Sequence, residues 1–309
     1  MNRRTFLMAG SAALAARQAV KSAAPKAKIC VFSKHLHFLQ GDALAEAAAT
    51  AGFDGVDLTV RAKGHVEPER VEAELPPLVK TLRGHGLEIP MITSGIVDAD
   101  SPFAESVLRT LAGLGIRHYR WGGLFYDLEK PIPPQLDAFR ARIARLAALN
   151  EKYGVCAMYH THSGPRQVGA SIWDLYLLLK DFNPDAVSVN YDTAHATVEG
   201  GYGGWMSSLR VCESHLRGIA IKDFLWTKDP KRGWRPQWCP VGEGMVNFPL
   251  FFKMLARQKF SGPIQMHYEY PLGGADTGGR SITISKDEVL AAMKRDLSLV
   301  RGWMSESGL

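Results

Sequence analysis

The sequence predicts one α/β domain, a single closed (β/α)8 barrel of the TIM-barrel class. Three observations lead to this fold class. Short apolar runs alternate strictly with longer amphipathic runs, eight such pairs follow one another, and no glycine-rich phosphate-binding turn follows the first apolar run. Strict alternation favours parallel strands joined by right-handed crossovers. Eight such units over about 280 residues suit a closed barrel better than an open sheet.

The predicted strands are short apolar runs bounded by polar or turn-forming residues, as expected for strands covered by helices. In chain order they are Ile29–Ser33, Gly55–Val60, Ile89–Ser94, His118–Trp121, Val155–His160, Ala186–Tyr191, Gly218–Lys222 and Pro263–Glu269. A doubly wound open sheet would instead require a glycine-rich fingerprint after the first strand. The residues Ser33-Lys34-His35-Leu36-His37 at that point include no glycine.

The predicted helices fill the intervals between these strands. They are Asp42–Ala51, Pro68–His85, Phe103–Leu114, Pro134–Tyr153, Ser171–Asp181, Met206–His215, Pro249–Gln258 and Lys286–Ser305. Two helices begin at a proline, Pro68 and Pro134, where the missing N–H does no harm. Four helices are followed by a glycine of the kind that caps a helix before a strand: Gly52, Gly86, Gly115 and Gly154.

The longest irregular stretch of the predicted barrel is Asp223–Asn247, which contains Trp226, Trp234 and Trp238 together with three prolines. A loop of this length inside a compact barrel is usually a functional lid or wall. Three tryptophans are too many for a solvated loop, because exposed aromatic patches usually mark binding surfaces. We therefore expect Trp226 and Trp238 to bind substrate. The alternative is that they pack the loop onto the barrel rim.

The first residues have the features of an export signal. Arg3 and Arg4 precede an uncharged run, Thr5–Ala16, which is too short to cross a bilayer as a helix, and small residues at Ser22–Ala24 offer a cleavage site. The arginine pair followed by Phe-Leu resembles a twin-arginine signal. Residues 1–24 are therefore predicted to be a signal peptide, 25–309 the barrel domain, and the protein periplasmic or extracellular. The alternative is a frayed basic terminus.

The charge balance gives no reason to expect a nucleic-acid partner. The net charge is +6, and residues 1–24 contain four cations and no acid, so their removal would leave +2. Such a balance provides no attraction to phosphate backbones. A membrane contact is expected only through the export signal. The four cysteines form no CxxC motif and no Cys/His cluster, so we expect no structural disulfide.

Reactive side chains gather at the carboxyl ends of the predicted strands, where barrel enzymes place their chemistry. Seven of the ten histidines lie at these ends or in the loops that follow. In chain order the candidate residues are His35, Asp57, Arg61, Arg120, His160, His162, Asp192, His195, Lys222, His267 and Glu269. Because side chains two residues apart share a strand face, imidazoles and carboxylates should converge across the mouth. Such a set can bind a divalent metal.

Three motifs resemble the xylose isomerase-like barrel superfamily. They are Tyr191–His195 with the sequence YDTAH, Ile221–Asp223 with the sequence IKD, and Val241–Gly244 with the sequence VGEG before Phe248. The resemblance covers roughly residues 28–305. The superfamily includes sugar-phosphate isomerases and epimerases, inosose dehydratases and the endonuclease IV branch. Its members typically bind a divalent metal through Glu, Asp, His and Glu on strands five to eight.

The chain departs from that ligand pattern. His160 takes the position of the first Glu, Asp192 agrees with the family, Ala220 replaces the His, and His267 best matches the second Glu. The resemblance therefore implies a softer ligand set of His160, Asp192 and His267 for Mn²⁺, Zn²⁺, Fe²⁺ or Mg²⁺. A metal-free site is the alternative.

The resemblance also implies a reaction: removal of a proton next to the carbonyl of a sugar or keto-sugar, with a metal or cation stabilising the oxyanion. The catalytic candidates are Glu269 as base, Lys222 at the oxyanion, and His195. The substrate-binding candidates are His35, Asp57, Arg61, Arg120, His162, Trp226 and Trp238.

Three other functions stay open or are disfavoured. The same enolate could expel a neighbouring oxygen, which would make the protein a keto-sugar dehydratase or lyase. Ala220 in place of a ligand also fits a catalytically inactive sugar-binding barrel. A nuclease like endonuclease IV needs more His and Glu ligands than remain here. Export favours a free sugar, a glycoside or a sugar acid over a phosphorylated sugar.

Overall fold

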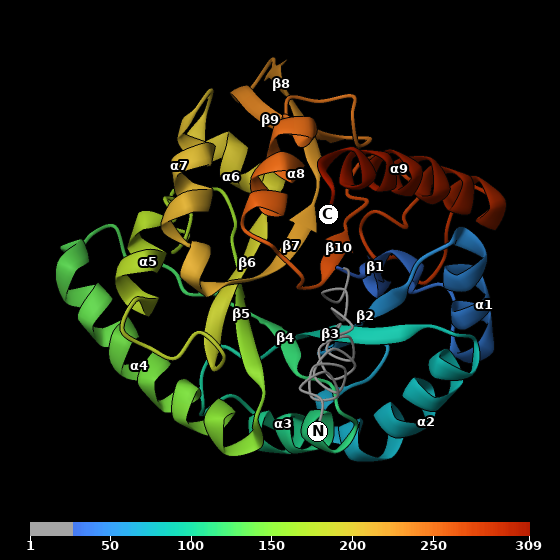
Figure 1. Ribbon diagram of the computed structural model, residues 1–309, viewed down its shortest axis with the longest axis horizontal. Helices are drawn as coiled ribbons and strands as arrows, with labels where there is room; N and C mark the ends of the chain where they lie inside the picture. Colours follow the sequence, from blue (N-terminus) through green and yellow to red (C-terminus); the bar gives the residue numbers. More distant parts are fainter. Residues whose placement is uncertain (1–26) are drawn as a thin grey trace, which may run out of the picture.

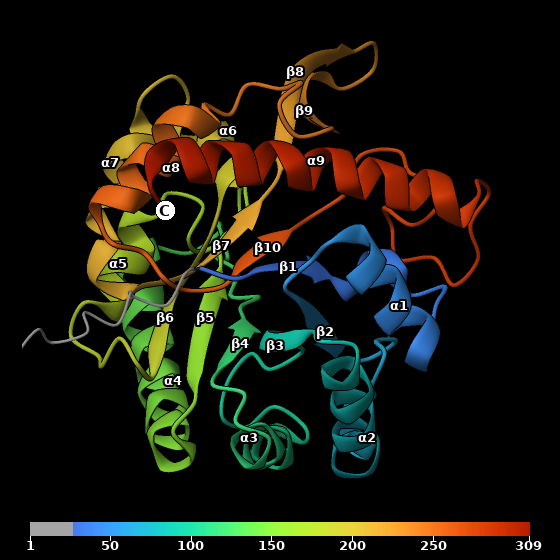
Figure 2. The ribbon, with the colours of Figure 1, turned by 45° about the vertical axis from the view of Figure 1, so that its right-hand side comes forward.

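The structure is a computed structural model that describes residues 27–309. The predicted signal peptide, residues 1–24, lies outside the described residues. Eight parallel strands close into a barrel in the order β1-β10-β7-β6-β5-β4-β3-β2. Helices surround these strands on the outside (Figures 1 and 2). The predicted single (β/α)8 barrel is confirmed.

The barrel strands agree closely with the predicted ones. They are β1 (Ile29–Phe32), β2 (Gly55–Val60), β3 (Glu88–Ser94), β4 (His118–Trp121), β5 (Cys156–His160), β6 (Val187–Asp192), β7 (Leu216–Ile221) and β10 (Ile264–Met266). The main difference lies in the last strand, which ends at Met266 rather than at Glu269. His267 and Glu269 therefore follow the strand, at the mouth of the barrel.

Nine α-helices cover the barrel within residues 27–309. They are α1 (Gly41–Ala51), α2 (Val71–Gly84), α3 (Ala104–Gly113), α4 (Ile132–Tyr153), α5 (Trp173–Leu179), α6 (Thr193–Gly200), α7 (Gly204–Val211), α8 (Phe248–Arg257) and α9 (Lys286–Ser307). Helix α6 was not predicted. It begins directly after β6 because the Asp192 carboxylate accepts the N–H of His195 and caps the helix.

The main apolar core lies between the strands and the helices, and a second small cluster of Cys30, Met91, Cys156 and Met158 lies apart from it. All four cysteines are free thiols, and three of them are buried. Strand β7 approaches β5 and β6 closely at Gly218, where a Cβ atom would lie only 2.9 Å from Met158 and from Asn190. No helix among residues 27–309 has the length and apolarity of a membrane span.

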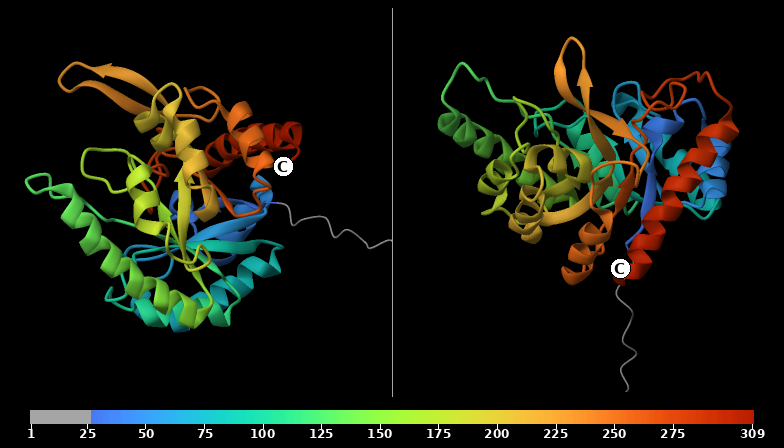
Figure 3. Two further views of the ribbon diagram at one scale, coloured as in Figure 1. Left: turned by 60° about the vertical axis from the view of Figure 1, so that its left-hand side comes forward. Right: turned by 90° about the horizontal axis from the view of Figure 1, so that it is seen from above.

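The stretch Asp223–Asn247, which we expected to be irregular, contains a regular hairpin. Strands β8 (Asp223–Asp229) and β9 (Gly233–Cys239) pair antiparallel, and the hairpin projects from the body of the barrel (Figure 3). The prolines of this stretch suggested a loop without strands. Pro236 nevertheless lies opposite Trp226 in a two-stranded ribbon, because each strand of such a ribbon has an outer edge that needs no N–H donor.

The base of this hairpin is fixed by Asp223. Its carboxylate accepts the backbone N–H groups of Gly242, Gly244 and Val246 at 2.9–3.1 Å. A Cβ atom at position 244 would collide with that carboxylate. The Val241–Gly244 motif is thus the segment that returns the chain from the hairpin to the barrel.

Candidate active site

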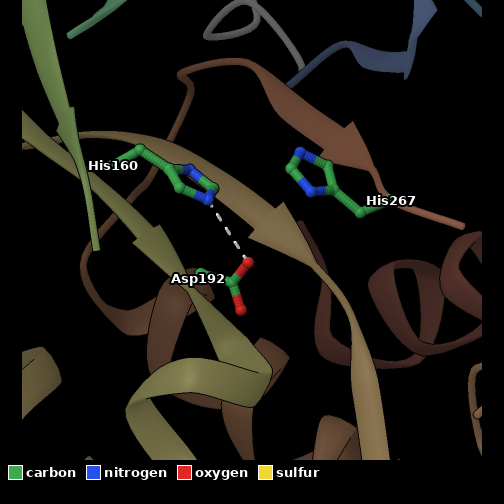
Figure 4. Close-up of side chains that lie close together, drawn as sticks. All are labelled: His160, Asp192 and His267. Carbon is green, nitrogen blue, oxygen red and sulfur yellow. Dashed lines mark ion pairs between the residues drawn. The ribbon is translucent and has the colours of Figure 1, made fainter. Parts of the chain in front are cut away.

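Four candidate side chains converge at the mouth of the barrel. His160 ends β5, Asp192 ends β6, Lys222 follows β7 and His267 follows β10. The imidazoles of His160 and His267 stack with their centroids 5.3 Å apart, and the Asp192 carboxylate lies beside them (Figure 4). Nε2 of His160 is 3.6 Å from Oδ2 of Asp192. The carboxyl ends of three separate strands thus bring two imidazoles and a carboxylate together.

This trio has the features of a metal site. One ligand atom from each of His160, Asp192 and His267 lies within 4.8 Å of the others, close to the spacing that one ion can bridge. Nε2 of His160, Oδ2 of Asp192 and Nδ1 of His267 are buried and accept or donate no hydrogen bond within the described chain. Burial lowers the pKa of both histidines well below their ordinary value, so the rings are neutral. Neutral imidazole is the form that binds metals.

Two amide side chains orient the imidazoles. Nε2 of His267 lies 3.2 Å from Oε1 of Gln265, and donation to that oxygen leaves a lone pair on Nδ1. Nδ1 of His160 lies 3.1 Å from the amide of Asn190, whose oxygen has no partner. A half-turn of this amide would let its oxygen accept the Nδ1 proton and leave the lone pair on Nε2. Such partners fix the tautomer of a metal-binding histidine.

Lys222 connects the trio to the remaining polar groups. The side chain is almost fully buried, and Nζ lies 2.8 Å from Oε2 of Glu269, 3.4 Å from Oδ2 of Asp192 and 3.1 Å from Nε2 of His195. The same Nζ lies over the indole of Trp238, 4.8 Å from its centroid. A single cation therefore contacts a candidate ligand, a candidate base and an imidazole.

Glu269 lies between two lysines. Nζ of Lys34 is 2.9 Å from its Oε1, opposite Lys222 on Oε2. Burial alone would raise the pKa of Glu269, but the charges of Lys222 and Lys34 outweigh burial and hold that pKa well below its usual range. The carboxylate is ionised, and its basicity is low while both lysines contact it. The role of Lys34 was not among the predicted ones, although its position directly after a strand was a signal.

His195 is held on the other side of Lys222. The backbone N–H and the hydroxyl of Ser163 contact its Nδ1 at 3.1 and 2.8 Å, and its ring lies edge-on to Trp238. Burial and the charge of Lys222 lower its pKa well below the ordinary value. His195 is therefore a neutral imidazole within hydrogen-bonding distance of Lys222.

A third group of polar side chains lies on β2 and β4 and in the segments that follow β2 and β5. Nη2 of Arg120 lies 3.3 Å from Nε2 of His162. The guanidinium carbons of Arg61 and Arg120 lie over the ring of Phe32, 5.5 and 5.7 Å from its centroid. Asp57 accepts the hydroxyl of Thr93, and burial raises its pKa to about 7.

Two predicted substrate residues make their contacts elsewhere: His35 lies edge-on to His267 but bonds within the fold, and Trp226 lies in another groove. His35 is fully buried, with Nδ1 3.1 Å from the carbonyl of Ala275 and Nε2 accepting the N–H of Tyr268. Its ring nitrogens are used within the fold. Trp226 lines a separate, largely apolar groove, whereas Trp238 faces His195 and Lys222. The groove residues are Thr197, Gly201, Tyr202, Trp205, Met206, Phe224, Trp226, Met245, Asn247 and Leu250.

The position expected to carry the family histidine lies at the level of the trio. Ala220 on β7 is in register with Asp192 on β6 and with Gln265 on β10. It is fully buried. A methyl group therefore takes the place of a fourth ligand, and the nearest cation to Asp192 is the Lys222 side chain.

Residues 45–288 match the family model described as Xylose isomerase-like TIM barrel. The chain belongs to the xylose isomerase-like TIM barrel family. No curated protein sequence matches it significantly.

Several solved structures share the fold of this family member at low sequence identity. One is an L-ribulose 3-epimerase, with a TM-score of 0.68, 15% identity, and coverage of 91% of this chain and 95% of that chain. A D-allulose 3-epimerase from Methylomonas sp. has a TM-score of 0.65 and 16% identity, with 90% and 98% covered. A 3-keto-D-glucoside 4-epimerase from E. coli has a TM-score of 0.61 and 15% identity, with 90% and 100% covered.

Proposed function

We propose that the protein is an enzyme of the sugar isomerase or epimerase type, which abstracts a proton next to the carbonyl of a sugar or keto-sugar. One observation carries this proposal: Lys222 contacts Glu269, Asp192 and His195 at once. A proton acceptor, a cation for the oxyanion and the candidate metal trio therefore lie within one small volume. These are the groups that such a reaction needs.

The trio of His160, Asp192 and His267 would hold a divalent ion, which when bound polarises the carbonyl oxygen of the substrate. The chain supplies the remaining chemistry. Lys222 donates a hydrogen bond to the oxygen that becomes negative as the proton leaves. This hydrogen bond competes with the one that Lys222 gives to Glu269 in the free protein.

That competition supports Glu269 as the base. In the free protein, Lys222 and Lys34 hold the basicity of Glu269 low. When Lys222 turns to the developing oxyanion, the carboxylate loses one of its two cationic partners and its affinity for a proton rises. The base is thus strengthened at the moment when the oxyanion forms.

His195 supports an epimerase in particular. Glu269 follows β10 and His195 begins helix α6 after β6, and both contact the same Nζ of Lys222. Two groups that can transfer protons therefore flank one oxyanion position. Inversion at carbon requires removal of a proton from one face and its return to the other face.

The test is proton exchange in D₂O. The protein, supplied with Mn²⁺, is incubated with ketohexoses and with 3-keto-glucosides, and the sugars are followed by NMR. We expect deuterium to enter the carbon next to the carbonyl and the epimer to appear. Deuterium incorporation followed by loss of water would assign the lyase reaction instead, and no exchange with any keto-sugar would contradict the proposed function.

A further inference from the structure

Two arginines at the mouth of the barrel have no acidic partner. Lys34 and Lys222 both form ion pairs with Glu269. Arg61 and Arg120 form no ion pair with any carboxylate of residues 27–309, and the only side-chain contact of hydrogen-bonding length recorded for either is the one from Arg120 to His162. Both side chains are partly buried. Cations that are withdrawn from water are normally paired, so the missing partner is expected to come with a ligand.

The two guanidinium groups lie close to the candidate metal trio. Both lie over the ring of Phe32, and that ring stacks on the imidazole of His267 with a centroid distance of 4.7 Å. One aromatic ring therefore separates the arginines from a candidate ligand. A small substrate with its carbonyl at the trio would reach the arginines with its other end.

The surrounding charge favours an anion. The mouth contains four cations, Lys34, Arg61, Arg120 and Lys222, which influence one another electrostatically. The carboxylates near them are Asp57, Asp192 and Glu269. Asp57 is only partly ionised at neutral pH because burial raises its pKa to about 7. A divalent ion bound at the trio would increase this excess of positive charge further.

We propose that Arg61 and Arg120 bind the carboxylate of the substrate, and that the substrate class is an acidic sugar such as a uronate or a keto-aldonate. The inference rests on the proposed function for the position of the reacting carbonyl. A planar guanidinium binds a carboxylate through paired hydrogen bonds. Phosphate is disfavoured because barrels usually bind phosphate after strands seven and eight. These arginines belong to β4 and to the segment after β2.

The experiment compares three sugars that differ only at carbon six. Binding of D-glucuronate, D-glucose and D-glucose 6-phosphate to the full, Mn²⁺-supplied protein is measured by calorimetry at low ionic strength. We expect D-glucuronate to bind about tenfold or more tightly than D-glucose. Arg61→Met and Arg120→Met should each remove most of that preference, measured as the ratio of the affinities for D-glucuronate and D-glucose. Arg61→Lys and Arg120→Lys, which keep the charge, should retain part of it.

Arg257→Met is the matched control, because Arg257 is an exposed arginine in the last turn of α8, at the opposite end of the barrel. It should change none of the three affinities. The salt dependence of D-glucuronate binding to the unmodified protein gives a second measurement if a Met variant fails to fold: the preference should shrink as salt rises.

Three results would overturn the inference: equal affinity for D-glucuronate and D-glucose, a preference that survives both Arg→Met substitutions, or tighter binding of D-glucose 6-phosphate. The proposed function fails separately. Proton exchange on keto-sugars together with equal affinity for D-glucuronate and D-glucose would keep the function and remove this inference. An arginine-dependent preference for D-glucuronate without proton exchange on any sugar would keep this inference and contradict the proposed function.

Discussion

The Nζ atom of Lys222 lies 2.8 Å from Oε2 of Glu269, and this ion pair is almost completely shielded on the lysine side. Because Lys34 contacts the other oxygen of the same carboxylate, Glu269 stays ionised at any physiological pH. Its ability to accept a proton therefore depends on how tightly the two lysines hold it. The distance between Lys222 and Glu269 is the quantity on which the proposed chemistry depends.

Glu269→Gln should reduce turnover by about two orders of magnitude or more, the usual scale for loss of a general base. Glutamine keeps the size of the side chain and its oxygen can still accept a hydrogen bond from one lysine, but it cannot take a proton. Substrate affinity should stay within a few-fold, and incorporation of solvent deuterium should stop. Steady-state kinetics together with NMR in D₂O measure both effects.

His195→Ala is the comparison that identifies the base. If Glu269→Gln keeps turnover and exchange while His195→Ala abolishes both, an imidazole removes the proton and Glu269 only positions Lys222. Reduced epimerisation with continued exchange in His195→Ala would instead assign the return of the proton to His195.

Metal content should depend on the trio. The purified protein is expected to carry about one divalent ion, and His160→Ala should lose most of it on dialysis because removal of one of few ligands sharply weakens binding. Elemental analysis measures the loss. His65→Ala is the control, since His65 bonds to Ser33 and to the carbonyl of Leu39 and lies outside the trio. Stoichiometric metal in the double variant His160→Ala/His267→Ala would contradict this ligand set.

Two of the three tryptophans of the hairpin, Trp226 and Trp238, should differ in their effect on KM. Trp238→Ala removes the ring that packs against Lys222 and His195, so we expect KM to rise by about tenfold, the scale of a lost cation–π and packing contact. Trp226 lies in the separate groove, so Trp226→Ala should leave KM unchanged. Equal effects of the two substitutions would mean that the groove also takes part in substrate binding.

Asp57→Asn should change how stability depends on pH. The pKa of Asp57 is about 7 in the folded protein, against the ordinary aspartate value of 3.8. Between these values the folded state binds a proton that the unfolded state does not bind. The contribution of Asp57 to the free energy of unfolding should therefore fall as pH rises from about 4 to about 7.

Asparagine removes that proton linkage while its oxygen can still accept the Thr93 hydroxyl. The stability of Asp57→Asn relative to the unmodified protein should increase by about 2–3 kcal/mol between pH 5 and pH 8. Urea unfolding at the two pH values measures it. Asp137→Asn, an exposed substitution on α4, should show no such change. A constant difference between Asp57→Asn and the unmodified protein would mean that Asp57 is ionised throughout.

We propose that the protein is exported, and this proposal rests on Arg3 and Arg4 ahead of a short apolar run. Replacing both arginines with lysine keeps the positive charge but should trap the precursor in the cytoplasm. Cell fractionation and immunoblotting follow the two forms. Full export of the lysine variant would remove the twin-arginine assignment.

The barrel itself was predictable because burial on both faces imposes a clear pattern. All six residues of β2 are buried, and the predicted bounds Gly55–Val60 are the observed ones. Helix α6 was missed although its signal was present: Asp192 caps the helix through the N–H of His195, and we interpreted that aspartate only as a ligand. The prediction therefore assigned Asp192 one of its two roles, that of a metal ligand, and missed its role as a helix cap.

The sequence predicted that the trio and Lys222 lie near one another, because the carboxyl ends of the parallel strands all lie at one end of a barrel. It did not reveal that Lys34 and Glu269 form an ion pair, since these residues are 235 positions apart and only barrel closure brings them together. The difference between Trp226 and Trp238 was equally hidden. It depends on the pairing of β8 with β9, which a sequence rich in proline does not suggest.

The hairpin of β8 and β9 leaves and rejoins the barrel at almost one point, because Asp223 and Cys239 face each other at its base. Its length can therefore change without any change in the closure of the barrel. An exchange of the segment 225–237 for a shorter or longer ribbon would leave Lys222, Trp238 and the Asp223 anchor in place. Substrate range in this enzyme scaffold could then be altered by replacing one surface element, with the residues at the strand ends untouched.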